Sequence, residues 1–450
     1  MTDSENVDSI LVDDVLLRIL SFSDIRSVIL ASQTNRHLHH LAFSRQVWLA
    51  LLSDLHARNF VDLMPGQRLH ELSTTELVDL VKHMVLGPQS WSASYSSGAT
   101  LARQFRVKAD ILHLQEHTVK LLSGGQFCLF SGPSTLGCFD LAQSKVIWSY
   151  RGSWTDELWA TDLDVQVIEG GRAAVILLGV HVLKEHPENF IELLRLDLVS
   201  GATTRLLLQQ APDFVVNISC GNICDDFAVV GLDNSKFNIM VLRISTGSSA
   251  VLQMGHECFF DLIPGYFICM QADISPDTFD LTFWSMEMLL DLQSESIVSI
   301  RTASPTATLR LGGPILSKYD LAVHPSPFCE ASYILWVLIA PNWGDSPSTM
   351  HKYHISHSKT TPLSIRPISI TKTEDGGAVF TMADEDISYA GYVRALNIDD
   401  NVLRIISLSE GTAKGTVLDI PDRGYWVHLS PYSNAIACTT NENIVVNYYE

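Results

Sequence analysis

The sequence has little positive charge and no cluster of it. Its 450 residues include 30 Lys and Arg against 50 Asp and Glu, a formal net charge of -20, and no two Lys or Arg residues are adjacent. Binding to a nucleic-acid backbone needs clustered basic side chains that displace counterions. The sequence therefore predicts a protein that does not bind nucleic acid. The acidic residues are spread thinly, with Asp384-Glu385-Asp386 as the longest run, which is typical of solvated loops.

Long apolar runs are also missing. The N-terminus carries Asp3, Glu5 and Asp8, where a secretory signal needs a basic and then an apolar stretch. The longest apolar stretches, residues 173–183 and 333–340, are shorter than the roughly 20 residues that span a bilayer. We therefore expect no membrane contact and a soluble protein of the cytoplasm, the nucleus or both.

The sequence lacks the motifs of common catalytic and metal sites. It contains no G-x-S-x-G, G-x-G-x-x-G, P-loop or H-E-x-x-H motif. Its eight cysteines show no paired spacing apart from Cys220 and Cys224, and two ligands make a zinc site improbable. His351, His354 and His357 lie in an alternating, strand-like stretch that scatters them over both faces. We expect reduced thiols, no cofactor, no metal and no catalytic activity.

The N-terminal residues have helical periodicity. From Leu11 to Leu55 the apolar residues recur at helical spacing in four short bursts. Each burst is opened by a residue able to cap a helix. These residues are Asp13 and Asp14 for the first burst, Asp24 for the second, Thr34 for the third and Ser44 for the fourth. So few residues cannot bury all of that apolar surface among themselves. Either the rest of the chain or a partner protein must cover part of it.

Three stretches of this segment resemble the F-box: Leu11–Phe22, Leu30–Arg36 and Val47–Leu51. In that family a Leu-Pro dipeptide opens the motif, an Ile-Leu pair follows about eight residues later, and a Leu-Trp pair closes it. Four residues match this pattern: Leu11, Ile19, Leu20 and Trp48. Three depart from it and lower the expected affinity: Val12 replaces the proline, and Ser23 and Val47 replace leucines.

The resemblance, which extends to fungal F-box domain-containing proteins, implies a partner and a function. Members of the family bind a Skp-type adaptor, which joins a cullin scaffold and a RING subunit in an SCF-type ubiquitin ligase. The implied interface is a helix-in-groove contact with apolar anchors. Carried onto this sequence, the adaptor-binding residues are Leu11, Val15, Leu16, Ile19, Leu20, Leu30, Val47 and Trp48. The alternative is a helical cap packed on its own β domain.

Residues 56–92 connect this segment to the remainder. Pro65-Gly66 predicts a turn, and Ser73 and Glu76 have capping-box spacing before a helix that Gly87-Pro88 ends. We interpret the segment as a semi-rigid helical linker, with the first helix of the large domain as the alternative. The predicted domains are 1–55 (F-box), 56–92 (linker) and 93–450 (substrate recognition).

After Trp91 the sequence becomes β-rich and weakly repetitive. Strand-turn units start at Phe139, Leu196, Leu242, Leu290, Tyr353 and Ile406, so 46 to 63 residues separate successive starts. This period fits four-stranded propeller blades with loop insertions. The fold class we predict is multidomain and mainly β: a small helical F-box followed by a degenerate WD-like β-propeller. We predict seven blades, with six or eight blades or another β-rich fold as alternatives.

One further expectation concerns closure of the ring. The last unit, Val445 to Tyr449, has no residues left for its outermost strand, so we expect Leu101–Val107 to supply it. Residues 227–231 and 237–244 are expected to form a hairpin.

The preferred function is a substrate receptor of an SCF-type ubiquitin ligase, with an unknown target of some basic character bound by the propeller. One alternative is an F-box scaffold outside a ligase. The other is a propeller enzyme with a helical cap, which should show a central funnel with converging carboxylates or histidines.

Overall fold

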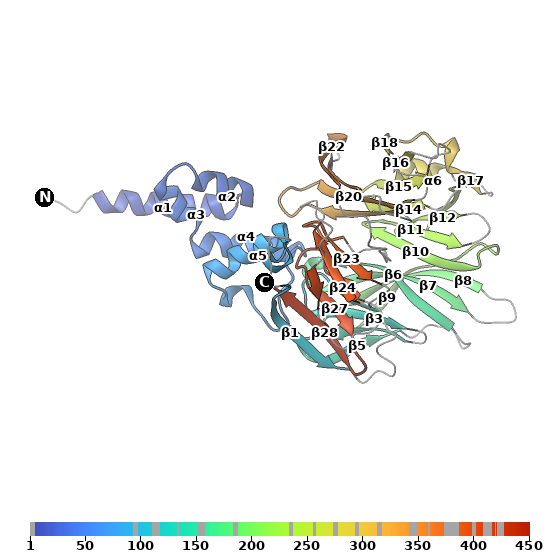
Figure 1. Ribbon diagram of the computed structural model, residues 1–450, viewed down its shortest axis with the longest axis horizontal. Helices are drawn as coiled ribbons and strands as arrows, with labels where there is room; N and C mark the ends of the chain where they lie inside the picture. Colours follow the sequence, from blue (N-terminus) through green and yellow to red (C-terminus); the bar gives the residue numbers. More distant parts are fainter. Residues whose placement is uncertain are drawn as a thin grey trace.

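The computed structural model joins a helical segment to a ring of β-sheets. It describes residues 5–92, 98–109, 118–132, 135–150, 158–182, 188–233, 237–254, 258–272, 278–292, 297–312, 317–341, 349–358, 361–372, 387–397, 402–407, 416–418, 420 and 427–450. The helices lie beside one end of the ring, with α1 extending away from it (Figure 1). No helix in these ranges is long and apolar enough to cross a membrane.

The helical segment contains five α-helices and two short turns of 3₁₀ helix. They are α1 (Glu5–Ser21), α2 (Ile25–Ser32), α3 (Arg36–Ala42), α4 (Arg45–Ala57), η1 (Leu69–Glu71), α5 (Thr74–Leu86) and η2 (Gln89–Trp91). Asp24 caps α2 by accepting a hydrogen bond from the Ser27 amide at 2.8 Å. Ser73 and Glu76 form the predicted capping box of α5, which ends at Gly87 with φ 74°.

Two helix starts differ from the prediction. The first helix begins at Glu5, so Asp13 lies inside it and not at its start. The third helix is capped by Asn35 and not by Thr34, because the Asn35 side chain accepts the Leu38 amide at 2.8 Å.

Seven sheets, antiparallel except for the added strand of blade 3, form the blades of the propeller. The prediction of a mainly β protein with a small helical N-terminal segment and a seven-bladed propeller is therefore confirmed. Blade 1 contains β2 (Thr118–Leu121), β3 (Phe127–Gly132), β4 (Thr135–Asp140) and β5 (Lys145–Ser149). Blade 2 contains β6 (Leu158–Ile168), β7 (Ala173–Val182), β8 (Glu188–Asp197) and β9 (Thr203–Gln210). Blade 3 contains β10 (Asn217–Cys224), β11 (Phe227–Asp233), β12 (Asn238–Arg243) and β13 (Ser249–Gln253), extended by β17 (Val298–Ser299).

The remaining blades follow the same order. Blade 4 contains β14 (Cys258–Ile263), β15 (Tyr266–Ala272), β16 (Thr278–Ser285) and β18 (Ala307–Gly312). Blade 5 contains β19 (Ser317–Pro325), β20 (Ser332–Pro341), β21 (Thr349–Ser358) and β22 (Thr361–Lys372). Blade 6 contains β23 (Tyr392–Asn397), β24 (Val402–Ser407) and β25 (Thr416–Leu418), and blade 7 contains β26 (Val427–Leu429), β27 (Ile436–Thr439), β28 (Asn443–Tyr449) and β1 (Leu101–Lys108).

The ring closes as the sequence predicts. Strand β1 pairs antiparallel with β28, with Phe105 opposite Val446 and Val107 opposite Ile444. The outermost strand of blade 7 therefore comes from the other end of the domain. The pairing covers the edge that β28 would otherwise expose.

The repeat units fall on equivalent strands with one exception. Four of them lie on the third strand of a four-stranded blade, at Phe139, Leu196, Leu242 and Tyr353. The fifth, Ile406, lies on β24, which in blade 6 follows β23 and the isolated bridge between Ile387 and Val393. The unit at Leu290 is wrong, because Met286–Asp291 form helix α6 after the third strand of blade 4. The α6 residues Met286, Leu289 and Leu290 are buried at helical spacing. The hairpin of β11 and β12 is confirmed.

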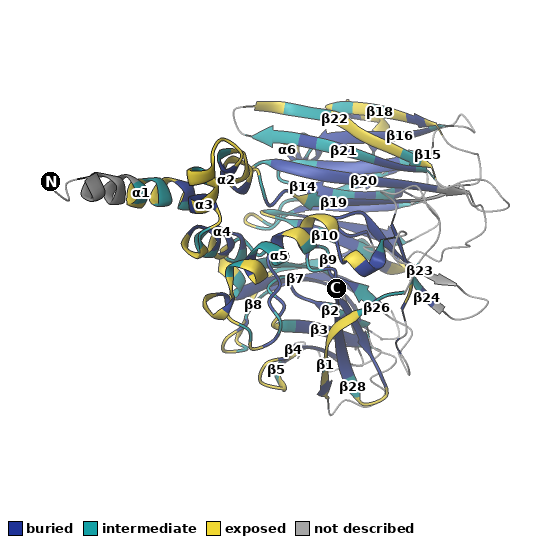
Figure 2. Ribbon diagram, turned by 60° about the vertical axis from the view of Figure 1, so that its left-hand side comes forward, coloured by how far each residue is buried: buried dark blue, intermediate teal, exposed yellow. Residues whose placement is uncertain are grey.

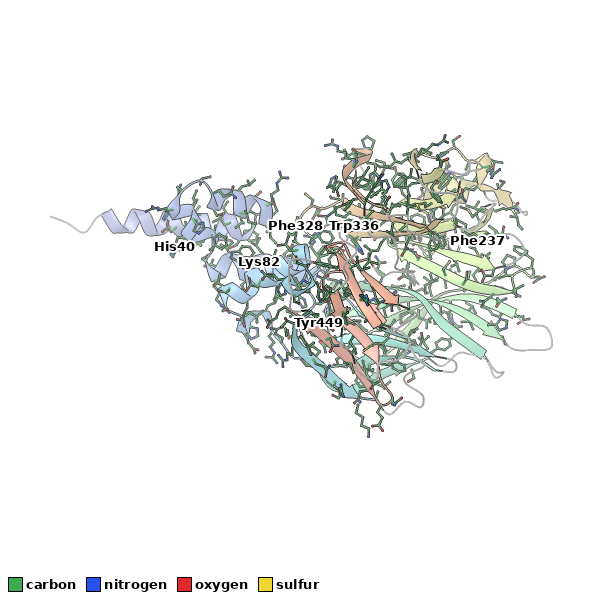
Figure 3. All side chains as sticks on the ribbon, viewed as in Figure 1. His40, Lys82, Phe237, Phe328, Trp336 and Tyr449 are labelled. Atoms are coloured by element: carbon green, nitrogen blue, oxygen red, sulfur yellow. The ribbon has the colours of Figure 1, made fainter. Side chains whose placement is uncertain are left out.

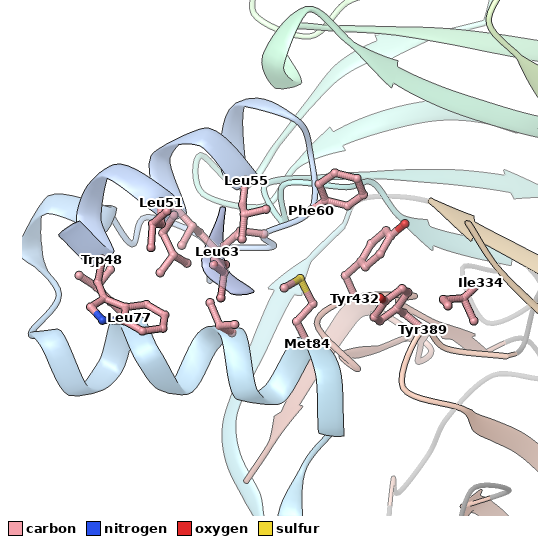
Figure 4. Packing of buried hydrophobic residues seen from close by; sticks show 14 of the residues in the cluster. Trp48, Leu51, Leu55, Phe60, Leu63, Leu77, Met84, Ile334, Tyr389 and Tyr432 are labelled. Carbon is pink, nitrogen blue, oxygen red and sulfur yellow. The ribbon is translucent and has the colours of Figure 1, made fainter. Parts of the chain in front are cut away.

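The helical segment and the propeller share one apolar core. Trp48, Leu55, Leu77 and Met84 of α4 and α5 belong to the same buried cluster as Ile334 and Trp336 of β20 and Tyr389 and Tyr432 of blades 6 and 7. Figure 4 shows residues of this cluster from Trp48 of α4 to Ile334 of β20. Phe328 and Trp336 mark the blade 5 side of this junction in Figure 3. The domain boundaries proposed from the sequence stay predictions, but residues 56–92 pack firmly on the ring.

Candidate functional site

Five exposed apolar side chains line the outer part of the helical segment. Val15 and Ile19 of α1 and Phe22, which directly follows that helix, recur at helical spacing and are 55%, 56% and 82% exposed. After the short turn at Ser23 and Asp24, α2 adds Ile29 at 39% and Leu30 at 53%. We call these five residues the α1–α2 stripe. Exposed residues on both helices are coloured yellow in Figure 2.

The stripe is held by polar contacts at its base. The His37 Nε2 of α3 lies 2.8 Å from the Asp13 carboxylate of α1. The Asp24 carboxylate bonds both the amide and the hydroxyl of Ser27, at 2.8 and 2.7 Å. These bonds hold the pKa of Asp24 below its usual value. The stripe is thus presented on a fixed frame.

The predicted adaptor-binding residues divide into two groups. Val15, Ile19 and Leu30 lie in the exposed stripe, whereas Leu20, Val47 and Trp48 are buried in the core below it, with Trp48 2% exposed. Leu16 packs against that core, and the side chain of Leu11 lies outside the described residues. Their role stays a prediction, but the buried residues can act on a partner only by supporting the stripe.

Two stripe residues were missed from the sequence. Phe22 is two residues after Leu20, the last residue of the first stretch that matches the F-box pattern. Ile29 directly precedes Leu30, where the second stretch begins. Ile29 lies at the border of the face of α2 that Ile25 and Val28 turn to the core, so it is only partly exposed. The helical spacing of Val15, Ile19 and Phe22 is the sequence pattern that could have identified Phe22.

A second candidate is the ring of polar residues on the innermost strands. Asp164 of β6 accepts the Ile223 amide of β10 at 2.8 Å. Asp261 of β14 accepts the Val323 amide of β19, also at 2.8 Å. Each aspartate therefore links its blade to the next one. Both also accept the amide of the following residue at 2.7 Å, as does Asp320 of β19.

Other side chains continue these links around the ring. Asn222 donates to Asp261 at 2.9 Å, and Lys120 of blade 1 lies 3.5 Å from Asp164. His324 of blade 5 bonds the Ile387 carbonyl of blade 6 at 2.7 Å, and the Leu121 amide donates to Nδ1 of His428 at 3.2 Å. The Tyr389 amide bonds the Pro431 carbonyl to join blades 6 and 7. Every junction between neighbouring blades thus has a polar link.

The electrostatics of this ring follow from burial. Burial raises the pKa of Asp261 to about 7, against three hydrogen bonds that lower it, and the nearby Asp164 adds to the rise. Burial also lowers the pKa of His428 to about 3 and that of His324 to about 4. Both imidazoles are therefore neutral at pH 7.

The carboxylates of Asp164 and Asp261 are engaged in hydrogen bonds within the protein. Each oxygen of Asp164 and Asp261 accepts at least one hydrogen bond from the protein. A general base needs a lone pair directed at a substrate. The carboxylates and histidines that a propeller enzyme would show are present, but these contacts hold the blades together. The sequence pattern that marks them is an aspartate between two apolar residues, at Asp164, Asp261 and Asp320.

The histidines of residues 351–357 are separated by the strand. His351 is buried and stacks on Tyr353, whereas His354 Nε2 bonds the Ser332 hydroxyl at 2.7 Å. His357 lies edge-on to Tyr266. Within the described residues no group of three or more His, Cys, Asp or Glu side chains is placed to hold a metal.

The comparisons with known proteins bear on the fold. No family model and no curated protein matches this chain. Similar solved structures include the hydrazine synthase of Kuenenia stuttgartiensis, at 10% identity and TM-score 0.42 over 76% of this chain and 97% of that one. The WD40 domain of SCAP from fission yeast aligns at 9% identity and TM-score 0.38, over 78% of this chain and 95% of that one. At these scores the similarities carry no argument about function.

The class of protein is therefore defined by its own architecture. It is a seven-bladed β-propeller with a helical cap fixed to one end. A propeller ring with many connecting loops, joined to helices with exposed apolar side chains, is consistent with a protein-interaction module.

Proposed function

We propose that this protein is the substrate receptor of an SCF-type ubiquitin ligase. In this proposal the α1–α2 stripe binds a Skp-type adaptor, the adaptor binds a cullin scaffold, and the propeller binds the target. The chain itself performs no catalysis and needs no cofactor. It raises the effective concentration of target lysines near a charged ubiquitin carrier.

The observation that carries the proposal is the exposed stripe on an otherwise well-packed segment. Four of its side chains, Val15, Ile19, Phe22 and Leu30, are more than half exposed, while Val47, Trp48 and Leu52 beneath them are fully buried. Full burial of one such side chain contributes about 1.5–3 kcal/mol. A partner that covers the stripe therefore gains enough free energy for specific binding, even after the cost of association.

The rigid junction supports the same role. The shared core with blades 5–7 fixes the direction in which the stripe points relative to the ring. A receptor with a fixed angle between its adaptor site and its target site places the target at a defined distance from the ligase. The adaptor site and the target site are then connected without a flexible linker.

The experiment compares two matched leucines in the full chain. Leu30 is 53% exposed in the last turn of α2, and Leu86 is 68% exposed in the last turn of α5. Leu30→Asp is expected to weaken co-purification with a Skp-type adaptor by tenfold or more, since about 1.4 kcal/mol corresponds to tenfold. Leu86→Asp should bind as the wild type does. Equal binding by both variants contradicts the proposal.

A second readout separates the ligase receptor from the scaffold alternative. The complex of chain and adaptor is mixed with the cullin and RING subunits and passed over a sizing column. Co-elution of all four is the result expected of a ligase receptor. Binding of the adaptor without entry into the cullin complex supports an F-box scaffold acting outside a ligase.

A further inference from the structure

The connection from β9 to β10 presents two apolar side chains to solvent. It comprises residues 211–216, in which Phe214 is 38% and Val216 is 72% exposed. Between them Val215 is buried among blades 2 and 3. Single exposed apolar residues are common on protein surfaces, so exposure alone identifies no site.

The loop is unusually well fixed for a surface connection. The buried Asn189 side chain of β8 donates to the Val215 carbonyl at 2.8 Å, and its backbone carbonyl accepts the Ala211 amide at 2.8 Å. The Asn189 Oδ1 lies 2.6 Å from Nδ1 of His181. At the other end, the Val216 amide donates to the Asp233 carbonyl at 3.0 Å.

This fixation has a consequence for binding. A loop that is already ordered loses little conformational entropy when a partner binds. Val215 anchors the loop inward while its neighbours Phe214 and Val216 point outward by alternation. The two exposed side chains are therefore preorganised, as the central contacts of protein interfaces commonly are.

The loop lies at the end of the ring away from the helices. The helical segment contacts connections between first and second strands, at Gly124 of blade 1 and Ser430 of blade 7. Successive connections of an antiparallel blade alternate between its two ends. A connection from an outer strand to the next inner strand, such as residues 211–216, therefore emerges at the opposite end.

The charged residues that the structure describes beside the loop are acidic. Asp213 is exposed within it, Asp233 is hydrogen-bonded to it through the backbone, and Glu188 directly precedes Asn189. Together with the net charge of -20, these carboxylates favour a basic partner. The apolar pair requires that the same partner also carry an apolar side chain.

We propose that Phe214, Val216 and Asp213 form the docking point for the target protein. The segment they bind carries a Lys or Arg beside a large apolar residue, with the apolar side chain covering Phe214 and Val216. This inference rests on the proposed receptor function, for which it names the docking surface and the chemistry of the target.

The probe is an array of immobilised 12-residue peptides in which Lys or Glu alternates with Leu or Ser. Full-length wild-type protein is expected to bind the Lys-Leu peptides and not the Glu-Leu or Lys-Ser peptides. Val216→Ser and Phe214→Ser should each weaken this binding by at least tenfold. Asp213→Lys should weaken binding to Lys-Leu peptides and strengthen binding to Glu-Leu peptides.

Val199→Ser is the matched control. Val199 is 77% exposed in the turn after β8, at the other end of the same blade. Equal binding by the Val216 and Val199 variants overturns the inference, as does binding of Lys-Ser peptides at wild-type strength. Adaptor co-purification is measured on the same samples. In the wild-type protein, binding of Lys-Leu peptides without adaptor binding refutes the ligase role alone, whereas adaptor binding without binding of Lys-Leu peptides refutes the docking loop alone.

Discussion

Asp62 joins the linker to the closure of the ring, and its removal should weaken both. Its carboxylate accepts the Gly124 amide of blade 1 at 2.7 Å and the Ser430 hydroxyl of blade 7 at 2.5 Å. The Leu63 amide adds a bond to the Gly124 carbonyl at 3.2 Å. The linker thus spans the junction between the first and last blades. Burial raises the pKa of Asp62, whereas its bonds to Ser430 and Gly124 lower it.

The magnitude follows from the groups that lose a partner. Asp62→Ala leaves the Gly124 amide and the Ser430 hydroxyl without an acceptor at a buried site, at about 1–3 kcal/mol each. Removing a buried carboxyl offsets part of that loss, so we expect destabilisation of about 3 kcal/mol. At roughly 2 °C per kcal/mol for a chain of this size, the melting temperature falls on the order of 5 °C.

Thermal unfolding of the full chain, followed by Trp fluorescence, tests this prediction. Asp62→Asn keeps the shape and one acceptor oxygen, so it should lose less than half as much as Asp62→Ala. A double-mutant cycle with Ser430→Ala should give a coupling of about 1 kcal/mol or more. Additive effects of the two substitutions, or an unchanged melting temperature in Asp62→Ala, refute the bridging role.

Three further outcomes can be measured. Because the pKa of Asp261 is raised in the folded protein, its contribution to stability is full below about pH 4 and is lost as the pH rises to about 7. Asp261→Asn should therefore reduce the change in unfolding free energy over this pH range by about 2 kcal/mol, after allowance for partial exposure of the side chain. Deletion of residues 443–450 removes β28 and its pairing with β1, and should open the ring to limited proteolysis at the blade 7 junction. Trp48→Ala should cost about 3–5 kcal/mol in urea unfolding, because the indole is buried between the helices, whereas Ile19→Ala should cost less than 1 kcal/mol.

Local patterns predicted the ends of helix α5 and the closure of the ring. The capping box at Ser73 and Glu76, the stop at Gly87 and the pairing of β1 with β28 depend on residues close in sequence or on the count of strands. These features were therefore accessible without a structure. The helix α6 was not, because its apolar residues also fit a strand-turn unit when only a short window is read.

The division of the helical residues between core and surface needed the tertiary structure. Val15 and Val47 both lie in helical patterns in the sequence, yet Val47 is fully buried in the shared core while Val15 is 55% exposed. The difference arises from which elements pack on each helix. Because α4 and α5 share a core with blades 5–7, separate fragments of this chain would expose buried apolar surface, and substitutions in the full chain are the sharper test.

The direct measurement of the central claim is the affinity of the full chain for a purified Skp-type adaptor by titration calorimetry. The proposed function predicts a Kd of about 1 μM or tighter for the wild type, and weakening of at least 100-fold when Ile19 and Phe22 are both replaced by Asp. Val199→Asp, on the propeller, should leave the affinity unchanged. Equal affinity of the double variant and the wild type, or no measurable binding by either, contradicts the account.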